Sequence, residues 1–363
     1  MRAAVLWEYG APFDVRADVE HRSLRPHEVL VRIRSAGVCA SDLSLAAGTF
    51  GQPLPAVLGH EGAGEVTEVG DQVRSVSVGD HVVVCWVPPC GRCPACRRGD
   101  DRLCSERRGS KQRGQGPADA VPDLRVGEQA VLRGMDAGTF AEECVLSEAG
   151  VVRIDRDVPF PVAAFLGCAV PTGVGAALRS AVVQPGDTVF VIGCGAVGLN
   201  AVMAAALAGA ASVVAVDPMP ARRDFARTVG ATDAVGPEEL GEATKSTGRG
   251  FDVGIDAVGS SGTIRQGWDA LRRGGTLAVV GAGRLDDQVV FSAYEVFHDE
   301  KKLTGSFYGG FNMHRDLDFL VSLWRSGRVP VERLLDRTEP LEAINDVVAA
   351  QRRGEVVRVM LTL

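Results

Sequence analysis

The chain has 363 residues, of which 46% are hydrophobic and 23% are charged, and its formal net charge is −7. This composition is typical of a soluble globular protein of about two domains, and the acidic balance argues against a nucleic-acid partner. The first residues carry no secretory or lipidation signal, and nine cysteines in such a chain predict a cytoplasmic protein with metal-bound or buried thiols rather than disulfides.

The first part of the chain, to about residue 150, contains short apolar or alternating runs between glycine-rich turns. These runs, 28–39, 62–70 and 80–87, predict β-strands. Residues 105–127 are polar and rich in glycine, proline, arginine and glutamine. We expect a surface loop there, whose basic residues are solvated rather than part of a binding patch.

After about residue 170, strand-like apolar runs alternate with helical patterns, and this order predicts a parallel, doubly wound α/β sheet. The successive segments are 187–193, a helix from Val197, 211–217, 221–231, 251–259, 263–274 and 274–283. The tail predicts a helix over 314–327 and a strand over 356–363.

A glycine motif lies inside the most apolar stretch, residues 189–216. This stretch is long enough to span a membrane, but the motif interrupts it and Asp217 follows at once, so we expect strand, turn, helix and strand, and no membrane contact. The motif has the form G-x-G-x-x-G, at Gly193, Gly195 and Gly198.

The motif alone is weak, but a strand precedes it, a helix follows it, and Asp217 closes the next strand 19 residues after Gly198. In this context the glycines admit a pyrophosphate and the aspartate binds ribose hydroxyls. Asp217 would repel a 2′-phosphate, so the pattern favours NAD over NADP. Arg222 and Arg223 could accept such a phosphate, although we favour an exposed helix face for them.

Four cysteines follow the spacing C-x2-C-x2-C-x7-C, at Cys90, Cys93, Cys96 and Cys104. This spacing favours a tetrahedral zinc site. The iron–sulfur alternative expects a shorter last gap with a following proline, and a loop without metal is the third possibility. Four thiolates leave no open position, so such a site stabilises its loop and the chemistry lies elsewhere.

Three separate motifs, GVCASD, GHEGAG and FLGCAVPTG, contain Cys39, His60 and Cys168. Each alone is weak, because a lone cysteine is often a small buried hydrophobe and a lone histidine is often a turn residue. Together, two thiolates and one imidazole leave a fourth zinc position to water or substrate, as in catalytic sites. Asp42 could accept the second ring N–H of His60, and Glu61 could modulate the site or transiently replace a ligand.

The order of CASD, GHEGAGEVTEVG, the four-cysteine loop and GCAVPTG resembles the zinc-dependent alcohol dehydrogenases of the medium-chain dehydrogenase/reductase superfamily, over nearly the whole chain. The resemblance implies a GroES-like, mostly-β catalytic domain, residues 1–170 and 313–363, and a Rossmann NAD-binding domain, residues 171–312. It implies two zinc ions per chain, both in the catalytic domain. The catalytic ion would be bound by Cys39, His60 and Cys168, and the structural ion by Cys90, Cys93, Cys96 and Cys104.

The resemblance also implies a mechanism in which zinc lowers the pKa of the alcohol, hydride passes to the nicotinamide, and Ser41 passes the proton toward the cofactor ribose. Two positions depart from the family pattern. Ser44 replaces a histidine that many members use to hand the proton to solvent, and Ala40 replaces a basic residue at the cofactor phosphate. The resemblance further assigns Arg358 to the pyrophosphate, Thr172 to the nicotinamide, and Trp86 and Phe140 to the substrate pocket, unless these two are core aromatics.

Within the family the chain resembles the class III-like branch, which includes thiol-adduct formaldehyde dehydrogenases and bacterial enzymes that hold NAD tightly. Arg108 stands where class III members bind the carboxylate of the adduct, but residues 45–57 lack the acidic residues of those members. We therefore expect an NAD- and zinc-dependent alcohol dehydrogenase acting on a small, primary alcohol or its aldehyde. The alternatives are an S-hydroxymethyl thiol-adduct formaldehyde dehydrogenase and a non-catalytic NAD-binding protein of the same fold. The resemblance also implies a homodimer, in which residues 301–310 could extend the sheet across a two-fold axis.

Overall fold

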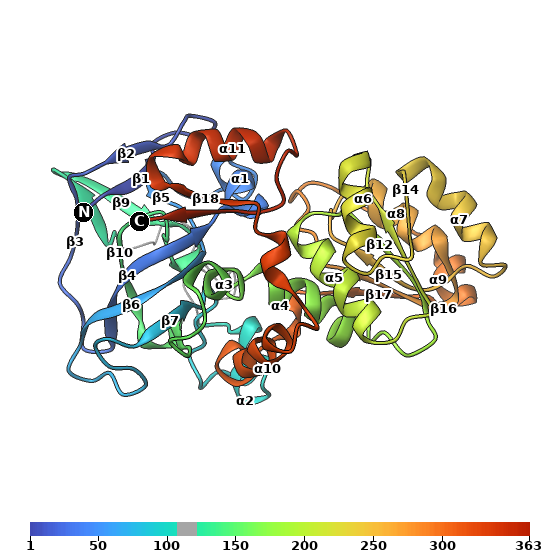
Figure 1. Cartoon of the computed structure of the whole chain (residues 1–363), viewed down its shortest axis with the longest axis horizontal. Coiled ribbons are helices and arrows are strands. Elements are labelled where there is room, and N and C mark those ends of the chain that lie inside the picture. The colour runs from blue at the N-terminus through green and yellow to red at the C-terminus, as the bar shows by residue number, and fades with distance from the viewer. Residues whose placement is uncertain (107–121) are drawn as a thin grey trace. The chain divides into compact units, whose positions relative to one another are not determined.

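The computed structural model describes residues 1–106 and 122–363, and this part of the chain divides into two compact units (Figure 1). The first unit comprises Met1–Cys168, Asn312–Phe319 and Val331–Leu363, and the second comprises Ala169–Phe311 and Leu320–Pro330. The domain limits expected from the sequence stay predictions. Arg108 lies outside the described residues.

Two sheets form the framework of the first unit in its described residues. One has six strands in the order β2-β1-β5-β9-β8-β3, and the other has seven, in the order β11-β7-β6-β4-β19-β18 with β10 also paired to β4. The bounds are β1 Ala3–Leu6, β2 Asp14–Arg16, β3 Val19–His21, β4 Glu28–Gly37, β5 Ala56–Val57, β6 Glu61–Val69, β7 His81–Val84, β8 Leu124–Val126, β9 Gln129–Arg133, β10 Glu143–Ser147, β11 Val151–Arg153, β18 Arg337–Pro340 and β19 Val359–Thr362.

Strands β4, β6 and β7 confirm the predicted β-strands. The loop predicted over 105–127 is wrong at its C-terminal end, where the chain forms a strand. Leu124–Val126 forms strand β8, which pairs with β3 and β9. Leu124 is buried, and so is Asp123 before it, which accepts hydrogen bonds from Arg22 and Arg133. The polar composition of this segment concealed the burial of its last residues.

The described α-helices of the first unit are short and lie between its strands in the chain. They are α1 Ala40–Ala46, α2 Pro94–Arg97, α3 Phe160–Phe165 and α11 Ile344–Arg352. Helix α10, Met313–Arg325, is shared by the segments of both units and confirms the helix predicted in the tail.

The second unit contains one parallel six-stranded sheet in the order β14-β13-β12-β15-β16-β17, and its residues are all described. Its elements are α4 Ala169–Gly175, β12 Thr188–Ile192, α5 Ala196–Leu207, β13 Ser212–Val216, α6 Pro220–Thr228, β14 Asp233–Val235, α7 Leu240–Ser246, β15 Phe251–Asp256, α8 Ser261–Ala270, β16 Leu271–Val279, α9 Ala293–Asp299 and β17 Lys302–Gly305. The apolar stretch 189–216 therefore folds as strand, turn, helix and strand, and the predicted doubly wound sheet is confirmed.

The strand order of this sheet reverses between β12 and β15, because the chain moves outward from β12 to β14 and then returns to the other side of β12. Ligands of doubly wound sheets bind at the carboxyl ends of the strands at such a point. The core beneath it includes Phe190 and Phe251, whose rings meet edge to face at 5.2 Å. Gly254 provides the space, since a Cβ there would lie 2.2 Å from the Phe190 ring.

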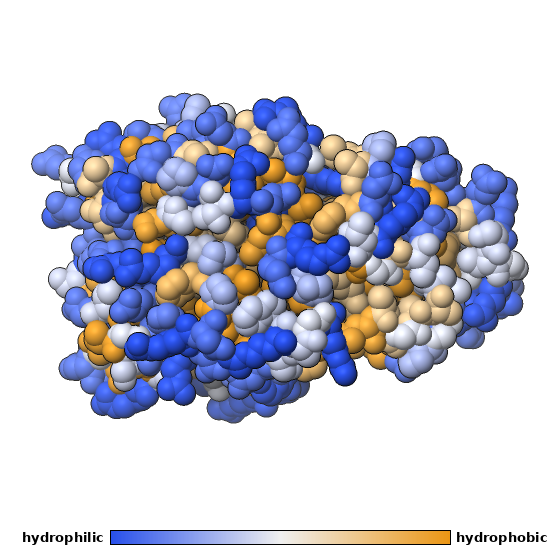
Figure 2. All heavy atoms as spheres, viewed as in Figure 1, coloured by the Kyte–Doolittle hydropathy of each residue, from blue (hydrophilic) through white to orange (hydrophobic). Residues whose placement is uncertain are grey.

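Hydrophilic residues cover much of the face shown in Figure 2, with apolar residues scattered among them. Among the described residues no helix is both long enough and apolar enough to cross a membrane.

Asp252 joins the beginnings of three strands in the second unit. Its carboxylate accepts hydrogen bonds from the backbone N–H and the hydroxyl of Thr188, both at 2.8 Å, and from Arg272 Nε at 2.6 Å. Only 5% of the residue is exposed, and burial alone would favour the neutral acid. The hydrogen bonds from Thr188 and Arg272 outweigh burial and lower the pKa of Asp252 to about 2.

We expect Asp252→Asn to destabilise the second unit by about 2 kcal/mol, because a buried charge-assisted network loses its anion. The folded pKa lies below the unfolded value, so the carboxylate stabilises the fold fully at neutral pH and loses this effect as the pH falls from about 4 toward 2. Urea unfolding followed by circular dichroism should show a large gap between wild type and variant at pH 7, and a narrower gap below pH ~4. Asp286→Asn is the matched control: it makes the same change in an exposed ion pair with Arg284 and should leave the midpoint nearly unchanged. Equal midpoints for the two variants would contradict the role given to Asp252.

Candidate active site

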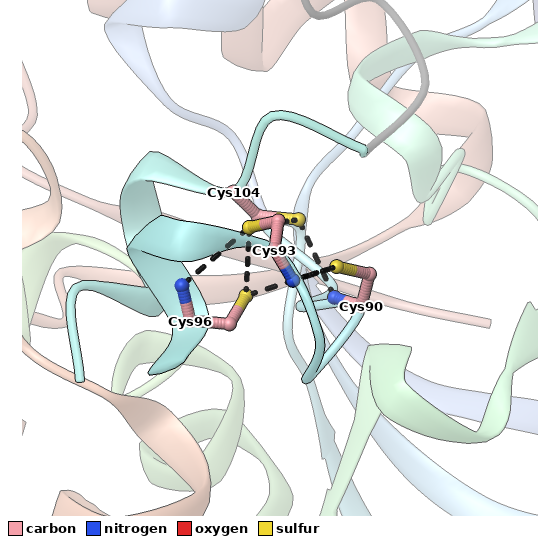
Figure 3. A group of neighbouring side chains, drawn as sticks. All are labelled: Cys90, Cys93, Cys96 and Cys104. Atoms are coloured by element: carbon pink, nitrogen blue, oxygen red, sulfur yellow. Dashed lines mark hydrogen bonds between the residues drawn. The ribbon is translucent and has the colours of Figure 1, made fainter. Parts of the chain in front are cut away.

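The four cysteines at the predicted spacing converge in the structure (Figure 3). Their sulfur atoms all lie within 4.8 Å of one another. The sulfur of Cys96 lies 3.5 Å from that of Cys93 and 4.0 Å from that of Cys90, and the sulfurs of Cys93 and Cys104 are 4.0 Å apart. Four thiolates at about 2.3 Å from one tetrahedral zinc ion would be separated by about 3.8 Å. The donor set and its spacing therefore fit zinc.

Backbone groups of the same loop favour the thiolate form that a metal needs. The backbone N–H of Cys90 donates to the sulfur of Cys104, and that of Cys93 donates to the sulfur of Cys90, both at 3.3 Å. The N–H of Cys96, in helix α2, lowers the pKa of the Cys93 thiol to about 5, whereas burial raises the pKa of the Cys96 and Cys104 thiols. The described residues contain no disulfide.

A second cluster forms where strands β4 and β6 pair antiparallel. The end of β4 lies beside the beginning of β6, with Gly37 opposite Glu61, so the chain segments that follow and precede these strands bring Cys39 close to His60. Cys168 joins them from the turn between α3 and α4. One donor atom from each of these three residues and from Glu61 lies within 4.8 Å of the others, and all four residues are buried.

Asp42, in the first turn of α1, holds this cluster in place. Its carboxylate accepts hydrogen bonds from the backbone N–H groups of Cys39 and Gly59, at 3.0 and 3.2 Å, and contacts the His60 Nδ1 at 3.0 Å. With Nδ1–H donating to Asp42, His60 Nε2 is the nitrogen left for a metal. This Nε2 is buried and has no hydrogen-bond partner among the described residues.

The residues of the second cluster thus fit a metal ion: two thiols, one imidazole nitrogen without a partner in the described part of the chain, and a carboxylate beside them. The electrostatics agree. A hydrogen bond from Cys168 and the charge of Arg358 lower the pKa of Cys39 well below its ordinary value. Burial disfavours the charged imidazole, but Asp42 raises the pKa of His60 well above its ordinary value, so a metal ion would displace a proton there.

Glu61 and Arg358 form a buried ion pair at the edge of this cluster. Arg358 Nη2 lies 3.3 Å from Glu61 Oε1, and 2% or less of either side chain is exposed. Arg358 Nη1 donates to the carbonyl of Val38, and the guanidinium lies 5.5 Å from the centre of the Phe165 ring. Burial raises the pKa of Glu61 to about 8, although the positive charge of Arg358 opposes this rise. The cofactor contact implied for Arg358 stays a prediction.

The remaining residues predicted around the metal lie as follows. Ser41 is half-buried in the first turn of α1, one turn before Ser44. The ring of Trp86 approaches the His60 ring edge to face at 5.6 Å. Phe140 is fully buried, edge to face with Phe13 at 5.9 Å, so it packs in the core. Whether Trp86 and Phe140 also line a substrate pocket stays a prediction.

The glycine motif forms the turn between β12 and α5. Gly193 has φ +91°, a conformation that favours glycine, and a Cβ on Gly198 would lie 1.8 Å from the Gly193 carbonyl. At Gly195 an added Cβ would meet nothing within 4 Å. The turn is therefore tight on its inner side and open at Gly195, as close approach of a pyrophosphate to the α5 N-terminus requires.

Asp217 follows β13 and ties this turn to the next strand. Its carboxylate accepts the backbone N–H groups of Cys194 and Met219, at 2.8 and 2.9 Å. Each carboxylate oxygen retains a lone pair that can accept a hydroxyl. Arg223 donates to the backbone carbonyl of Asp217 at 2.9 Å, while Arg222 Nε is buried without a partner among the described residues. Thr172 is buried in α4.

Sequence reasoning missed two contributors to the metal cluster, the close contact of Gly37 with Glu61 and the ion pair of Glu61 with Arg358. Arg358 is the charged residue of the apolar run VVRVMLTL, and this position was the signal that could have identified it as a buried partner. No local pattern distinguishes Gly37 from the many other glycines of the chain.

Comparisons with known proteins agree with this geometry. Residues 25–156 match the family "Alcohol dehydrogenase GroES-like domain", and residues 196–322 match the family "Zinc-binding dehydrogenase". The chain is 34% identical to alcohol dehydrogenase B of Mycobacterium tuberculosis, over 98% of this chain and 96% of that protein. It is 32% identical to S-(hydroxymethyl)glutathione dehydrogenase of Candida maltosa, over 100% of this chain and 97% of that protein.

A solved structure extends the likeness to the fold. Benzyl alcohol dehydrogenase of Acinetobacter calcoaceticus is 30% identical and superposes with a TM-score of 0.90, over 100% of this chain and 99% of that chain. The GroES-like and Rossmann fold assignment is thereby confirmed. The chain belongs to the zinc-dependent alcohol dehydrogenases of the medium-chain dehydrogenase/reductase superfamily.

Proposed function

We propose that the protein interconverts a primary alcohol and its aldehyde, with NAD as the hydride acceptor or donor. The observation that carries the proposal is the convergence of Cys39, His60 and Cys168 into one buried cluster, in which an imidazole nitrogen has no hydrogen-bond partner among the described residues. A non-catalytic NAD-binding protein would have no need of this complete set. The overall reaction converts the alcohol and NAD⁺ into the aldehyde, NADH and one proton.

The catalytic metal would be held by Cys39, His60 and Cys168, and the structural metal by the four cysteines of Figure 3. Zinc at the first site would act as a Lewis acid that lowers the pKa of the alcohol, and NAD at the glycine turn would accept the hydride. Asp42 fixes the His60 tautomer through its hydrogen bond to Nδ1. Ser41 accepts the proton of the alcohol and passes it toward the cofactor ribose. Glu61 would transiently replace one of the three metal ligands.

The proton then leaves without help from a histidine on α1, since position 44 is a serine. A serine hydroxyl donates and accepts hydrogen bonds but does not titrate near neutral pH. We therefore assign the last transfer to water.

The cofactor proposal rests on the second unit. Gly195 leaves room for a pyrophosphate, and Asp217 presents a carboxylate to the ribose. The negative charge of Asp217 favours NAD, whereas Arg222 is the group that would accept a 2′-phosphate. Thr172 and Arg358 complete the proposed cofactor contacts.

For the substrate, Trp86 beside His60 supports a pocket that is narrow near the metal and favours primary alcohols. The likeness to S-(hydroxymethyl)glutathione dehydrogenase supports a thiol adduct of formaldehyde as the second candidate. We also propose the domain limits 1–170 with 313–363 and 171–312, and a cytoplasmic location.

The activity is tested by following NADH formation with the zinc-loaded protein and a panel of primary, aromatic, secondary and polyol alcohols. Formaldehyde with glutathione is added as a separate substrate, and NADP as a separate cofactor. Turnover of primary alcohols without thiol supports the first candidate, and turnover only with formaldehyde and glutathione supports the second. Silence with every substrate would contradict the proposal.

The two metal sites should respond differently to loss of one thiol. Cys39→Ala should lower kcat/KM by about a thousandfold, because a Lewis acid contributes several kcal/mol to the transition state, while the fold and about one zinc per chain remain. Cys93→Ala should lower the thermal midpoint, because its loop loses the metal that holds it together. Metal analysis, circular dichroism and kinetics on both variants make the comparison. Cys144→Ala is the control, since Cys144 is equally buried but belongs to neither cluster. Full activity of Cys39→Ala would refute the catalytic assignment.

Cofactor preference should depend on the charge of Asp217. Asp217→Asn removes the repulsion of a 2′-phosphate and keeps an oxygen that accepts a backbone N–H, so the ratio of kcat/KM for NADP to that for NAD should rise about tenfold or more. Asp224→Asn, an exposed change in helix α6, serves as the control and should leave the ratio unchanged. An unchanged ratio in Asp217→Asn would remove Asp217 from cofactor selection.

We propose a homodimer formed by the edge of the parallel sheet. Strand β17 is the last strand on its side and pairs only with β16 among the described residues. Leu303 on this strand is 46% exposed, and Tyr294 and Phe297 on α9 are 67% and 79% exposed. Two identical edges can pair antiparallel about a two-fold axis, which covers both the unpaired backbone groups and the apolar side chains.

Light scattering after size exclusion should give twice the chain mass of 38.2 kDa for the wild type. Phe297→Asp combined with Leu303→Asp should shift the mass toward one chain, because each chain would bury two negative charges at the dimer interface. Val78→Asp is the control, since Val78 is 62% exposed in the first unit. A wild type that runs as a monomer would contradict the dimer.

A further inference from the structure

The Glu61 carboxylate lies close enough to the metal cluster to close it. Its donor oxygen is within 4.8 Å of the donor atoms of Cys39, His60 and Cys168, and the residue is fully buried. Four protein donors would complete a tetrahedral ion and leave no position for a substrate. A site that binds an alcohol therefore needs something that keeps this carboxylate off the metal.

Gly37 provides space for the carboxylate on one side. It pairs with Glu61 across β4 and β6, and a Cβ built on Gly37 would lie 2.1 Å from Glu61 Oε2. The next nearest atoms to that Cβ are also atoms of Glu61, at 3.1 and 3.2 Å. The missing side chain at position 37 is thus matched to this one carboxylate.

Arg358 provides the opposite charge. Its Nη2 lies 3.3 Å from Glu61 Oε1, and only 2% of the arginine side chain is exposed. The hydrogen bond of Nη1 to the Val38 carbonyl fixes the guanidinium, and the Phe165 ring lies against it at 5.5 Å. A guanidinium fixed in this way competes with a metal ion for the carboxylate.

We propose that Gly37 and Arg358 are positioning residues that hold Glu61 beside the catalytic metal and keep the fourth coordination position open. This inference rests on the proposed metal site. It gives Arg358 a role at the metal that is separate from the cofactor contact, and it gives Gly37 a role where none was assigned.

The test replaces zinc by cobalt, whose absorption reports its ligands, in the full-length protein. Cys39→Ala identifies the cobalt absorption that belongs to the catalytic site, because that part disappears in this variant. In Arg358→Met and in Gly37→Ala, we expect this absorption to shift and to stop responding to added imidazole, a probe of the open position. We also expect the metal affinity of the site to rise about tenfold or more, because Glu61 would become a fourth protein ligand. Competition with a chelator measures this affinity.

Removing the carboxylate should reverse both effects. Arg358→Met combined with Glu61→Gln, and Gly37→Ala combined with Glu61→Ala, should restore the imidazole response. Arg133→Met is the control for loss of a buried arginine, since Arg133 pairs with the buried Asp123 and not with the metal cluster. Its cobalt absorption should match that of the wild type.

The outcomes separate this inference from the function on which it rests. If Cys39→Ala removes no cobalt absorption, the proposed catalytic metal site is wrong. If that absorption is present but unchanged in Arg358→Met and Gly37→Ala, the positioning role is wrong and the metal site stands. An effect of Arg358→Met on the KM for NAD alone would likewise overturn the positioning role.

Discussion

The buried carboxylate of Asp42 is the interaction on which the metal cluster depends. One anion accepts two backbone N–H groups and contacts the ring of His60, and so it joins the segment after β4 to the segment before β6. A buried carboxylate without such partners would be costly, and here each partner belongs to a residue at or beside a candidate ligand. Cys39 and His60 are therefore oriented by protein groups before a metal arrives. The hydrogen bond of His60 Nδ1 to Asp42 leaves Nε2 as the ring nitrogen that faces the cluster.

The two cysteine-containing clusters are built on different principles. In the four-cysteine loop the ligands are neighbours in sequence, and the apolar cluster of that loop consists of Ala95 and the cysteines themselves. A metal there would take the place of a hydrophobic core. The second cluster is built on the strand pair β4 and β6, whose packing exists without the metal. Loss of metal should thus unfold the four-cysteine loop, whereas the cluster on β4 and β6 should lose its metal and keep its fold.

Local patterns carried the sequence prediction far. The four-cysteine spacing, the glycine turn after β12 and the alternation of strands and helices all depend on residues near one another in the chain, and the structure brings each together as expected. The failures have a common cause, which is that contacts between segments distant in the chain leave no local pattern in the sequence. Leu124 was placed in a loop because its neighbours are polar, although it pairs and is buried between β3 and β9.

The same cause explains why Gly37 and Arg358 were not seen as partners of Glu61. Their contacts join β4, β6 and the segment before β19, and no spacing rule links such distant positions. The roles of Ser41, Trp86 and Phe140 depended on resemblance from the start, and geometry alone does not decide them.

The assignment of residues to the two units has a consequence for how such a protein changes over evolutionary time. Every candidate metal ligand belongs to the first unit, whereas the glycine turn and Asp217 belong to the second. Mutations that alter the choice of dinucleotide therefore need not disturb the metal, and the reverse also holds. A descendant that lost Cys39 would keep the parallel sheet and its glycine turn, because both belong to the second unit and Cys39 belongs to the first.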